Sequence, residues 1–322
     1  MLTGPQYIRY YSTKKPLYTS INGRPALYGL SGVAILGIGS LCVNRHHHAE
    51  ALSSSSSAGK EGKAFNSYGF ISLKLRETQD INHNVKRFRF DLPNEDQVTG
   101  LTVSSFVLIR LTKPGTEDKF WPSYVFRPYT PVSMEDDVGF LDLIVKKYDS
   151  GGASEQIHNL KPGENVQFFG KPISFRKYEP NKVDSISMIA AGSGITPMVQ
   201  LLRKIMENPD DQTKVHLLYC NSTEQDILLR DQLMQLEQAH GNQFKVTYCL
   251  SRPDNSWNGE RGRITAEMIK RYLPEASTNT EVYICGPDGF TNLIKGKKGF
   301  FGRGKKGLLE QLGYETGQVH AF

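Results

Sequence analysis

Hydrophobic and polar residues alternate in the first half of the chain with the period of two that is typical of β-strands. Residues 87–92 read Arg-Phe-Arg-Phe-Asp-Leu, so every second side chain is apolar. Further strand-like runs, separated by turns rich in Gly, Pro, Asp and Asn, are Phe106–Leu111, Phe140–Tyr148 and Val166–Phe169. The longest helical pattern among them is short, at Ser154–Leu160. Several short strands at this spacing predict a small antiparallel β-barrel over residues 66–175.

The second half of the chain, residues 183–322, alternates strand and helix patterns. The predicted strands are Ser185–Ala191, Lys214–Cys220, Phe244–Leu250 and Glu281–Cys285. The predicted helices are Pro197–Met206, Ser222–His240, Ala266–Tyr272 and Lys306–Leu312. Such alternation predicts a parallel sheet with helices on both faces, which binds ligands at the carboxyl ends of its strands. The expected fold class is therefore β + α/β, an antiparallel β-barrel domain followed by a parallel-sheet domain.

Composition and charge narrow the class of protein. The chain has 322 residues, of which 38% are hydrophobic and 22% charged, as in a globular protein of about two domains. The formal net charge is +6, but five basic and no acidic residues precede Glu50, and the rest of the chain is nearly balanced. This distribution argues against a nucleic-acid-binding surface on the folded part. The four cysteines lack Cys-x-x-Cys spacing, which argues against a disulfide framework and a thiolate zinc site.

The first 25 residues contain Arg, Lys, Ser, Thr and Tyr but no acid, which is the composition of a mitochondrial presequence. Arg9–Ser12 resembles the cleavage signal of the mitochondrial processing peptidase. An unstructured basic tail is the alternative. We expect residues 1–25 to be a mitochondrial presequence.

An uncharged segment, Ala26–Val43, follows between Arg24 and Arg45. As a helix it would be about 27 Å long, close to the ~30 Å hydrocarbon core of a bilayer, so a single transmembrane anchor is predicted. Its glycines favour a buried hairpin or a signal-type segment as the alternative. Residues 44–65 contain three consecutive histidines and a serine run. Histidines on a tether lack the fixed geometry of a metal site, and a flexible linker is predicted.

Within the predicted barrel, residues 127–133 read Arg-Pro-Tyr-Thr-Pro-Val-Ser. The two prolines predict an extended edge rather than a central strand. Arg127 offers a bidentate fork for a pyrophosphate, Tyr129 a ring that packs on an isoalloxazine, and Thr130 a hydroxyl that bonds to it. Taken alone, this segment is equally an edge strand without a ligand.

These residues resemble the Arg-x-Tyr-(Thr/Ser) flavin motif of the NADH–cytochrome b5 reductase family, within the wider ferredoxin–NADP reductase group. The downstream residues that match this family in order are Ile144, Val145, Lys146 and Tyr148, then Gly151, Gly152, Ala153 and Ser154, then Leu160–Gly163 and Gly170–Pro172. The resemblance covers about residues 66–322 and implies FAD bound at Arg127, Pro128, Tyr129 and Thr130, with Lys146 attracting the nicotinamide nucleotide. Ser154 is expected to cap a short helix beside the pyrophosphate. The Gly151–Ser154 segment is one residue shorter than the family's Gly-Gly-Lys-Met-Ser.

The first predicted strand of the second half ends in Gly-Ser-Gly-Ile-Thr-Pro-Met, residues 192–198. Gly192 and Gly194 would bring the phosphates of a dinucleotide to a helix N-terminus. Thr196 suits the N-cap of that helix and Pro197 its first position. Tight turns use the same residues, but all seven positions match the resembling family.

The last predicted strand leads into Cys285, Gly286 and Pro287. A buried cysteine that behaves as a small hydrophobe is the alternative. The resemblance implies instead that Cys285 lies beside the nicotinamide and borders the path of the hydride, while Thr196 lies near the polar edge of the isoalloxazine. The family continues Pro-Pro-Met, whereas this chain has Asp288-Gly289-Phe290.

Two further segments bear on the donor and the acceptor. Ser251 and Arg252 stand where NADH-preferring relatives carry an acidic residue that binds the adenosine ribose and repels a 2′-phosphate, so NADH and NADPH both stay open. A turn with an exposed arginine is the alternative. Residues 295–306 carry six basic side chains and no acid. A solvated loop is the default for such a run, but it would also steer an acidic redox partner or contact anionic lipid.

The resemblance implies a membrane-anchored flavoprotein reductase in which NAD(P)H delivers a hydride to FAD and single electrons pass to a haem protein such as cytochrome b5. Met206–Arg230 and Leu312–Phe322 resemble fungal mitochondrial members. The expected location is the inner membrane facing the intermembrane space, with the outer membrane as the alternative. Two other functions stay open. One is a mitochondrial redox assembly factor that works with the haem attachment machinery of cytochrome c, and the other is a non-catalytic FAD-binding scaffold.

Overall fold

The computed structural model describes residues 62–66, 68–113, 115–116, 120, 123–148, 152–277, 279–297 and 304–322. These residues belong to one structural unit, Ser55–Phe322. The predicted presequence, the predicted anchor and most of the predicted linker lie outside the described residues.

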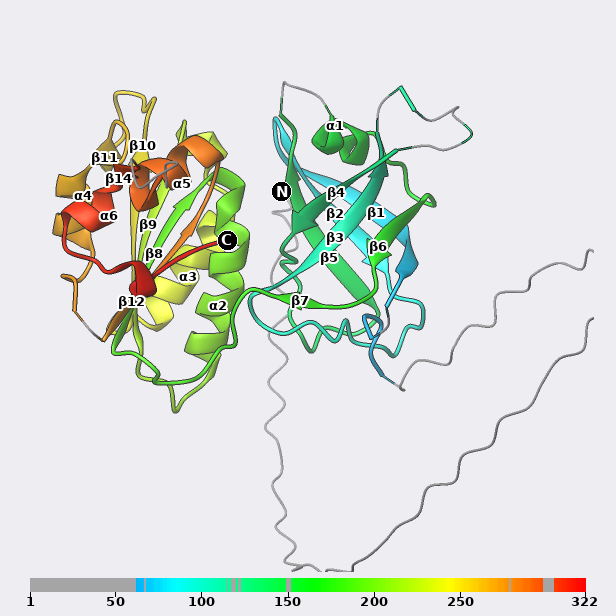
Figure 1. Cartoon of the computed structure of the whole chain (residues 1–322), viewed down its shortest axis with the longest axis horizontal. Helices are drawn as coiled ribbons and strands as arrows, with labels where there is room; N and C mark the ends of the chain where they lie inside the picture. Colours follow the sequence, from blue (N-terminus) through cyan, green and yellow to red (C-terminus); the bar gives the residue numbers. More distant parts are fainter. Residues whose placement is uncertain are drawn as a thin grey trace, which may run out of the picture. The chain divides into compact units, whose positions relative to one another are not determined.

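The first part of the unit is an antiparallel sheet (Figure 1). Its strands are β1 (Phe70–Asn82), β2 (Val85–Asp91), β3 (Ser105–Thr112), β4 (Tyr124–Tyr129), β5 (Phe140–Lys146), β6 (Asn165–Phe169) and β7 (Ile173–Ser174). They pair in the order β4-β3-β6-β1-β2-β5, with β7 also paired to β3. One short helix, α1 (Ala153–His158), follows β5.

The alternation of apolar residues produces this sheet as predicted. Phe88 and Phe90 on β2 are fully buried, whereas Arg87 and Arg89, which alternate with them, are only partly buried. The first three residues of the proline-containing segment, 127–129, end β4, which lies at one end of the strand order, as the proline content predicted. The N–H of Val132, just after β4, donates to the carbonyl of Asp142 on β5 at 2.9 Å. Because β4 and β5 are the two ends of the order, this bond curves the sheet back on itself, as expected of a barrel.

The folded region begins earlier than the predicted boundary at residue 66. Ala64 and Phe65 are 6% and 2% exposed and pack in the core of the first sheet. Their N–H groups donate to the carbonyls of Val98 and Thr99. The predicted linker therefore ends too late, because an alanine and a phenylalanine after a polar run carry no periodic signal of their own.

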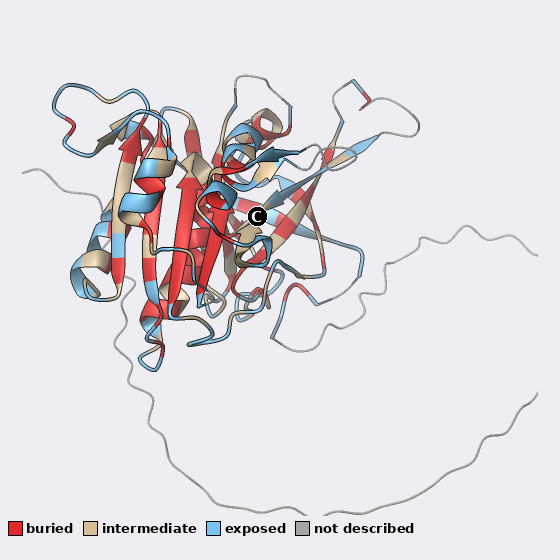
Figure 2. Ribbon diagram, turned by 60° about the vertical axis from the view of Figure 1, so that its left-hand side comes forward, coloured by how far each residue is buried: buried red, intermediate tan, exposed pale blue. Residues whose placement is uncertain are grey.

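The second part of the unit is a parallel sheet (Figure 1). Its strands are β8 (Ser185–Ala191), β9 (Lys214–Asn221), β10 (Phe244–Leu250), β11 (Glu260–Arg261), β12 (Thr280–Cys285) and β15 (Val319–Ala321), in the order β11-β10-β9-β8-β12-β15. The helices are α2 (Ile195–Glu207), α3 (Arg230–Ala239), α4 (Ala266–Tyr272), α5 (Asp288–Lys295) and α6 (Leu308–Gln311). A small hairpin joins β13 (Gly296–Lys297) and β14 (Lys305–Lys306). Figure 2 shows that the central strands of this sheet are buried along most of their length.

The structure corrects two predicted helices and adds elements that the pattern missed. The predicted helix at residues 222–240 is interrupted: a 3-10 turn, Glu224–Asp226, is closed by reciprocal hydrogen bonds between Thr223 and Asp226, and α3 starts only at Arg230. Between them Leu229 adopts a left-handed conformation with φ of 56°, which no helical pattern signals. The helix predicted at residues 306–312 is shorter, and α5 and β15 were not predicted.

Buried residues of both sheets share one apolar cluster. Val85, Val103 and Ile144 from the first part pack with residues of α2 and β8. Ser104, held at a positive φ of 66°, donates its N–H to the buried Gln200 Oε1 on α2 at 3.1 Å. These contacts pack the antiparallel sheet against α2, the helix that follows the glycine turn at residues 192–194, while residues 127–133, the flavin-type segment, lie on and after β4.

Candidate functional site

The glycine turn and the end of β12 meet through their backbones. A Cβ on Gly194 would lie 2.3 Å from the carbonyl oxygen of Cys285 and 2.8 Å from the nitrogen of Gly286. Gly192 has a φ of +53°, in the left-handed region. β8 and β12 pair in register, with Cys285 opposite Ala190. Two motifs more than 90 residues apart in the sequence are thus brought into contact at the carboxyl edge of the parallel sheet, and no side chain fits between them.

A buried tyrosine holds this turn in place. Tyr219 on β9 is fully buried, and its hydroxyl donates to the carbonyl of Gly192 at 2.9 Å. The same hydroxyl accepts the N–H of Leu228 at 3.2 Å. Burial raises the pKa of Tyr219, so it stays a neutral donor. Sequence reasoning did not single out Tyr219, because its partners lie nine and 27 positions away and neither partner uses a side chain.

Thr196 and Pro197 lie two residues further into the helix than predicted. A 3-10 turn over Gly192–Gly194 precedes α2, so Gly194 occupies the N-cap and Thr196 lies within the first turn. The Thr196 hydroxyl donates to the carbonyl of Ser193 at 3.3 Å instead of accepting an N–H. The N-cap prediction was therefore wrong, since the tight turn lets the helix begin before the threonine. Both residues are buried and remain close to the glycine turn.

Cys285 is a neutral thiol at the end of β12. Its side chain is partly buried, and burial raises its pKa to about 11, with the N–H of Gly286 acting in the opposite direction. Gly286 packs tightly, since a Cβ there would lie 2.9 Å from Phe290 and 3.0 Å from Ala191. Pro287 leads into α5, whose first residue is Asp288. A neutral, polarizable side chain at this position fits a role in packing and does not supply an acid or a base.

The flavin-type segment presents its side chains from the edge strand. Arg127 and Pro128 are exposed, and the guanidinium donates to the neighbouring carbonyl of Phe126 at 3.0 Å, with no other hydrogen bond from it among the described residues. Tyr129 is half-buried, and burial raises its pKa to about 12 although the charge of Arg127 lowers it. Thr130 is half-buried as well. An exposed arginine beside a half-buried phenol is the arrangement expected of groups that contact an anionic cofactor with an aromatic end.

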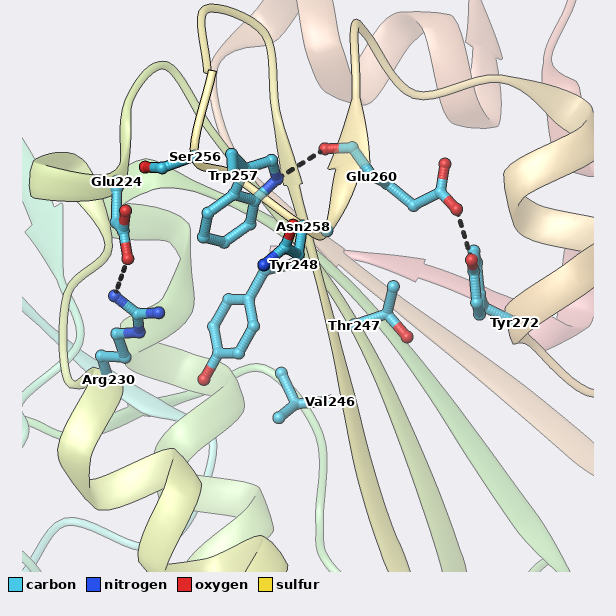
Figure 3. Close-up of a pocket in the computed structure, with 11 residues that line it drawn as sticks. Glu224, Arg230, Val246, Thr247, Tyr248, Ser256, Trp257, Asn258, Glu260 and Tyr272 are labelled. Carbon is cyan, nitrogen blue, oxygen red and sulfur yellow. Dashed lines mark hydrogen bonds and ion pairs between the residues drawn. The ribbon is translucent and has the colours of Figure 1, made fainter. Parts of the chain in front are cut away.

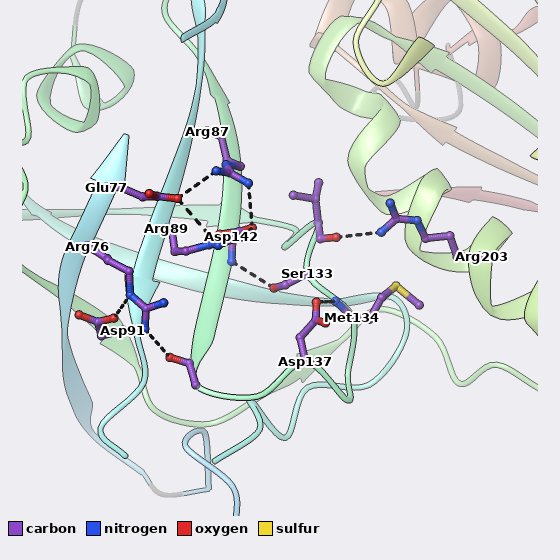
Figure 4. A network of polar contacts seen from close by, with 12 residues as sticks. Arg76, Glu77, Arg87, Arg89, Asp91, Ser133, Met134, Asp137, Asp142 and Arg203 are labelled. Atoms are coloured by element: carbon purple, nitrogen blue, oxygen red, sulfur yellow. Dashed lines mark hydrogen bonds and ion pairs between the residues drawn. The ribbon is translucent and has the colours of Figure 1, made fainter. Parts of the chain in front are cut away.

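A polar network fixes the residues that follow this segment (Figure 4). Asp142 on β5 is buried, and Arg89 makes two hydrogen bonds to it at 2.8 and 2.7 Å. The N–H of Asp142 donates to the Ser133 hydroxyl at 3.1 Å. From α2, Arg203 donates to the carbonyl of Val132 at 3.2 Å. The network thus ties the end of the flavin-type segment both to its own sheet and to the helix that starts at the glycine turn.

The residues predicted on the next strand divide between two environments. Val145 packs in the core of the antiparallel sheet, whereas Ile144 packs in the cluster shared with the parallel sheet. The ammonium of Lys146 lies 3.5 Å from the Asp226 carboxylate. Burial raises the pKa of Asp226, but hydrogen bonds from Thr223 and the charge of Lys146 outweigh it, so the pKa lies below its usual range. Lys146 is therefore held at the junction of the two sheets.

The short helix after β5 is placed differently from its prediction. Gly151 lies outside the described residues. Gly152 is the N-cap of α1 with a φ of 84°, and Ala153 and Ser154 are buried in the first turn. The Ser154 hydroxyl accepts the N–H of Tyr148 at 3.2 Å and caps nothing. The capping prediction was wrong, because α1 begins one residue before the serine.

Ser251 and Arg252 are exposed beside the end of β9. Their N–H groups donate to the carbonyls of Asn221 and Ser222 at 3.0 and 2.8 Å, so the two strand ends lie together. Asn221 is 8% exposed, and its side-chain amide makes no hydrogen bond within the described part of the chain. A buried amide without a partner calls for a ligand or a water. Together with the glycine turn and the exposed Arg127, it makes the residues present fit a flavin and a dinucleotide.

A pocket of ≈ 580 Å³ lies within the parallel-sheet part, next to the loop that follows β10 (Figure 3). Its wall includes Tyr248, Trp257 and the ion pair between Glu224 and Arg230. Neither Ser251 nor Arg252 lines it. The pocket shares the loop with these two residues but contains none of the predicted site residues.

The described residues lack both a metal-binding cluster and a membrane-spanning helix. No group of three or more His, Cys, Asp or Glu side chains that could hold a metal ion is present in that part of the chain. Among the same residues, which do not include 26–43, no helix has the length and apolar character needed to cross a membrane.

Comparison with known proteins assigns one cofactor to each of the two sheets. Residues 72–177 match the family model described as an oxidoreductase FAD-binding domain, and residues 188–296 match that of an oxidoreductase NAD-binding domain. A protein of Pyricularia oryzae named NADH-cytochrome b5 reductase 2 is 40% identical over 319 residues, covering 98% of this chain and 95% of that one. Its namesake in Botryotinia fuckeliana is 44% identical over 267 residues, covering 82% and 75%.

A solved structure resembles the chain over the same region. It is the cytochrome b5 reductase domain of Ulva prolifera nitrate reductase, with a TM-score of 0.70 and 31% identity. The match covers 81% of this chain and 100% of that domain. The fold of both sheets is therefore similar to that of a cytochrome b5 reductase domain.

Proposed function

The chain belongs to the NADH–cytochrome b5 reductase family and is an FAD-dependent oxidoreductase, and from this premise we propose that it is a mitochondrial, membrane-anchored enzyme that reduces a haem protein of the cytochrome b5 type. Bound FAD supplies the chemistry that converts a hydride from NAD(P)H into single-electron transfers. The chain's own residues bind, orient and shield the two cofactors.

One observation supports this proposal more than any other: the contact between Gly194 and the backbone of Cys285 and Gly286. It places free N–H groups of the glycine turn beside a neutral thiol and at the start of a 13-residue helix, where the helix dipole favours phosphates. A dinucleotide bound there would have its pyrophosphate at the turn and its nicotinamide beside Cys285.

Residues of the antiparallel sheet would bind the flavin. Arg127, exposed on the edge strand, is free to form a bidentate contact with a pyrophosphate. Tyr129 and Thr130, both half-buried, would contact the isoalloxazine. Burial raises the pKa of Tyr129 to about 12, so its hydroxyl keeps its proton at neutral pH and would be able to donate a hydrogen bond to a ligand. No protein residue is needed as a general acid or base.

Ser251 and Arg252 would determine whether NADH alone or also NADPH binds as the hydride donor. Both are exposed at the carboxyl end of β10, beside the end of β9, where the buried amide of Asn221 has no hydrogen-bond partner among the described residues. A serine followed by an arginine can bind a 2′-phosphate, whereas a carboxylate would repel it. The family name indicates NADH for the relatives, and this pair would extend the range of the present chain to NADPH.

Ser251→Asp tests that assignment. The new carboxylate should weaken NADPH by about 10- to 100-fold, the effect of one charged contact, while NADH binding changes little or improves. The measurement is KM for each donor with ferricyanide as the acceptor. Ser256→Asp, on the same loop and also exposed, is the control for added negative charge. Equal losses for NADH and NADPH in the Ser251 variant would remove the 2′-phosphate site.

The location rests on the sequence. Residues 1–25 have the composition of a presequence and residues 26–43 that of a single anchor, which would place the cofactor-binding part in the intermembrane space. Import into isolated mitochondria, followed by carbonate extraction and protease treatment before and after opening the outer membrane, tests this. A protein that is released by carbonate, or that is digested in intact mitochondria, would contradict the inner-membrane arrangement.

A further inference from the structure

The outer surface of the antiparallel sheet carries a set of side chains that the proposed reaction does not use. Alternation along β1, β3, β4 and β6 turns Leu73, Ile109 and Phe168 into the core, where each is almost fully buried. The residues of opposite parity face outward. We call the outward-facing group formed by Phe70, Arg110, Tyr124, Phe126 and Phe169 the aromatic patch.

The aromatic patch is unusually open for large apolar side chains. Phe70, Tyr124 and Phe126 are 41%, 44% and 45% exposed. A single exposed ring on a protein surface needs no explanation, but a contiguous group of them is typical of an interaction surface. The rings are contributed by several strands of one sheet, so they form a face and not a projecting loop.

The side chains of the patch touch one another and enclose a cation. The ring centroids of Phe70 and Phe126 are 6.0 Å apart with their planes at 21°, and Phe169 lies 6.0 Å from Phe70 on its other side. The Arg110 guanidinium is 4.4 Å from the centroid of Phe70 and also 4.4 Å from that of Tyr124. The arginine is therefore sandwiched between two rings, and its charge belongs to the aromatic surface.

A second pair extends the surface toward the start of the folded chain. The Lys171 ammonium lies 4.2 Å from the ring of Tyr68, which is 79% exposed. The N–H of Gly170 donates to the carbonyl of Gly69 at 2.9 Å, so this pair adjoins Phe70 and Phe169. Exposed rings with cations among them, and no carboxylate in either group, are the composition of a surface that contacts anionic head groups.

We propose that the aromatic patch rests on the surface of the bilayer that holds the predicted anchor, with its rings at the level of the head groups and Arg110 and Lys171 near lipid phosphates. The inference rests on the anchor of the proposed function. Gly62, where the described part of the folded unit begins, follows Val43, the end of the predicted anchor, by 19 residues. A flexible linker of that length would span about 22–26 Å, which would hold the folded unit close to the membrane.

This orientation leaves the cofactor site accessible. On β4, Tyr124 and Phe126 face the same side, and the intervening positions face the other. Arg127 and Tyr129 are therefore on the opposite side of the strand from the patch. A chain resting on its aromatic patch would keep the side chains of Arg127 and Tyr129 on the side of β4 that faces away from the lipid.

A tryptophan placed in the patch reports on contact with lipid. The full-length holoprotein is reconstituted into vesicles of phosphatidylcholine and phosphatidylserine, with and without bromine on the acyl chains. Tyr124→Trp is compared with Met234→Trp on α3, whose 42% exposure matches the 44% of Tyr124. Both variants also carry Trp121→Phe, so that Trp257 contributes the same background tryptophan fluorescence to each of them. NADH-driven ferricyanide reduction confirms that each variant is folded and active.

We expect brominated lipid to quench most of the fluorescence added by Tyr124→Trp and to leave that of Met234→Trp unchanged. Replacing Arg110 by Gln in the Tyr124→Trp chain should reduce the quenching in phosphatidylserine-containing vesicles. Protein that floats with the vesicles but shows no quenching at position 124 overturns this inference alone. So does a blue shift at position 124 without quenching, which would mean that protein covers the patch. Protein that does not float overturns the proposed anchor, and the inference with it.

Discussion

The two cofactor-binding segments are built in opposite ways. The glycine turn before α2 is packed backbone against backbone, with Gly194 in contact with Cys285 and with the buried Tyr219 bonded to Gly192. The flavin-type segment lies on an edge strand, with Arg127 and Pro128 open to solvent. Packing within the fold therefore fixes the conformation of the glycine turn. The side chains of the flavin-type segment are instead placed where they would contact a ligand. Substitutions should separate the two: those in the turn should affect stability, and those on the edge strand should affect binding alone.

Gly194→Ala should have the largest effect. A Cβ at 2.3 Å from the Cys285 oxygen forces the end of β12 to move, and we expect a loss of about 3 kcal/mol in the free energy of unfolding. Gly289→Ala, in α5 with no atom within 4 Å, is the matched control and should be neutral or stabilising by up to about 1 kcal/mol. Urea unfolding of both variants measures this. Equal stability would show that the two motifs are not in contact.

Arg127→Ala should weaken FAD by about 10- to 100-fold and leave the stability of the apoprotein within about 0.5 kcal/mol, because the side chain is exposed and, among the described residues, bonds to a neighbouring carbonyl alone. Lys161→Ala, another exposed cation in the same sheet region, is the control. Flavin titration of the apoprotein and urea unfolding are the measurements. A loss of stability without a loss of flavin affinity would make Arg127 a structural residue and reverse the comparison.

Tyr219→Phe should destabilise the glycine turn less than Gly194→Ala does. It leaves the carbonyl of Gly192 and the N–H of Leu228 without their buried partner, at a cost of about 1–3 kcal/mol in stability. KM for the nicotinamide nucleotide should rise, whereas the affinity for FAD should stay the same. If Tyr219→Phe weakened FAD and the nucleotide equally, the turn and the edge strand would not be the independent units described above.

The smallest of the predicted effects is the pH dependence of the free energy of unfolding. A histidine beside each of the two sheets should contribute to it. Burial lowers the pKa of His158 beside β5 and of His216 on β9, so both stay neutral in the folded chain. The unfolded chain takes up protons near its ordinary value of about 6.5 and therefore binds more protons than the folded one below that pH. Stability should be fully present above about pH 7 and fall as the pH drops through 6. Replacing either histidine by Gln should flatten this dependence, and a stability that is constant over the window would contradict it.

The sequence predicted the strands well because burial imposes a simple periodicity on them. β8 and β10 have the predicted bounds, and Phe88 and Phe90 are buried as their alternation with arginines indicated. The proline content of residues 127–133 likewise placed β4 at an edge. These features depend on residues that are close together in the chain, which is what a sequence pattern can report.

The contacts that assemble the site were not predictable in this way. Tyr219 acts on a carbonyl 27 positions away, and Arg203 reaches a carbonyl 71 positions away. The N-cap expected at Thr196 was lost to a 3-10 turn, and the helix expected from Ser222 was interrupted by a left-handed leucine. In each case the local sequence is compatible with more than one conformation, and tertiary packing determines which one forms.

The most direct test of the central claim is anaerobic stopped-flow spectroscopy of the purified, FAD-loaded protein. The flavin absorbance is followed at its usual band near about 450 nm after mixing with NADH or NADPH. Rapid bleaching by NADH is the predicted result, and bleaching by NADPH in addition would support the role of Ser251 and Arg252. Bound flavin that stays oxidised with both donors would contradict the reductase and leave a flavin-binding scaffold.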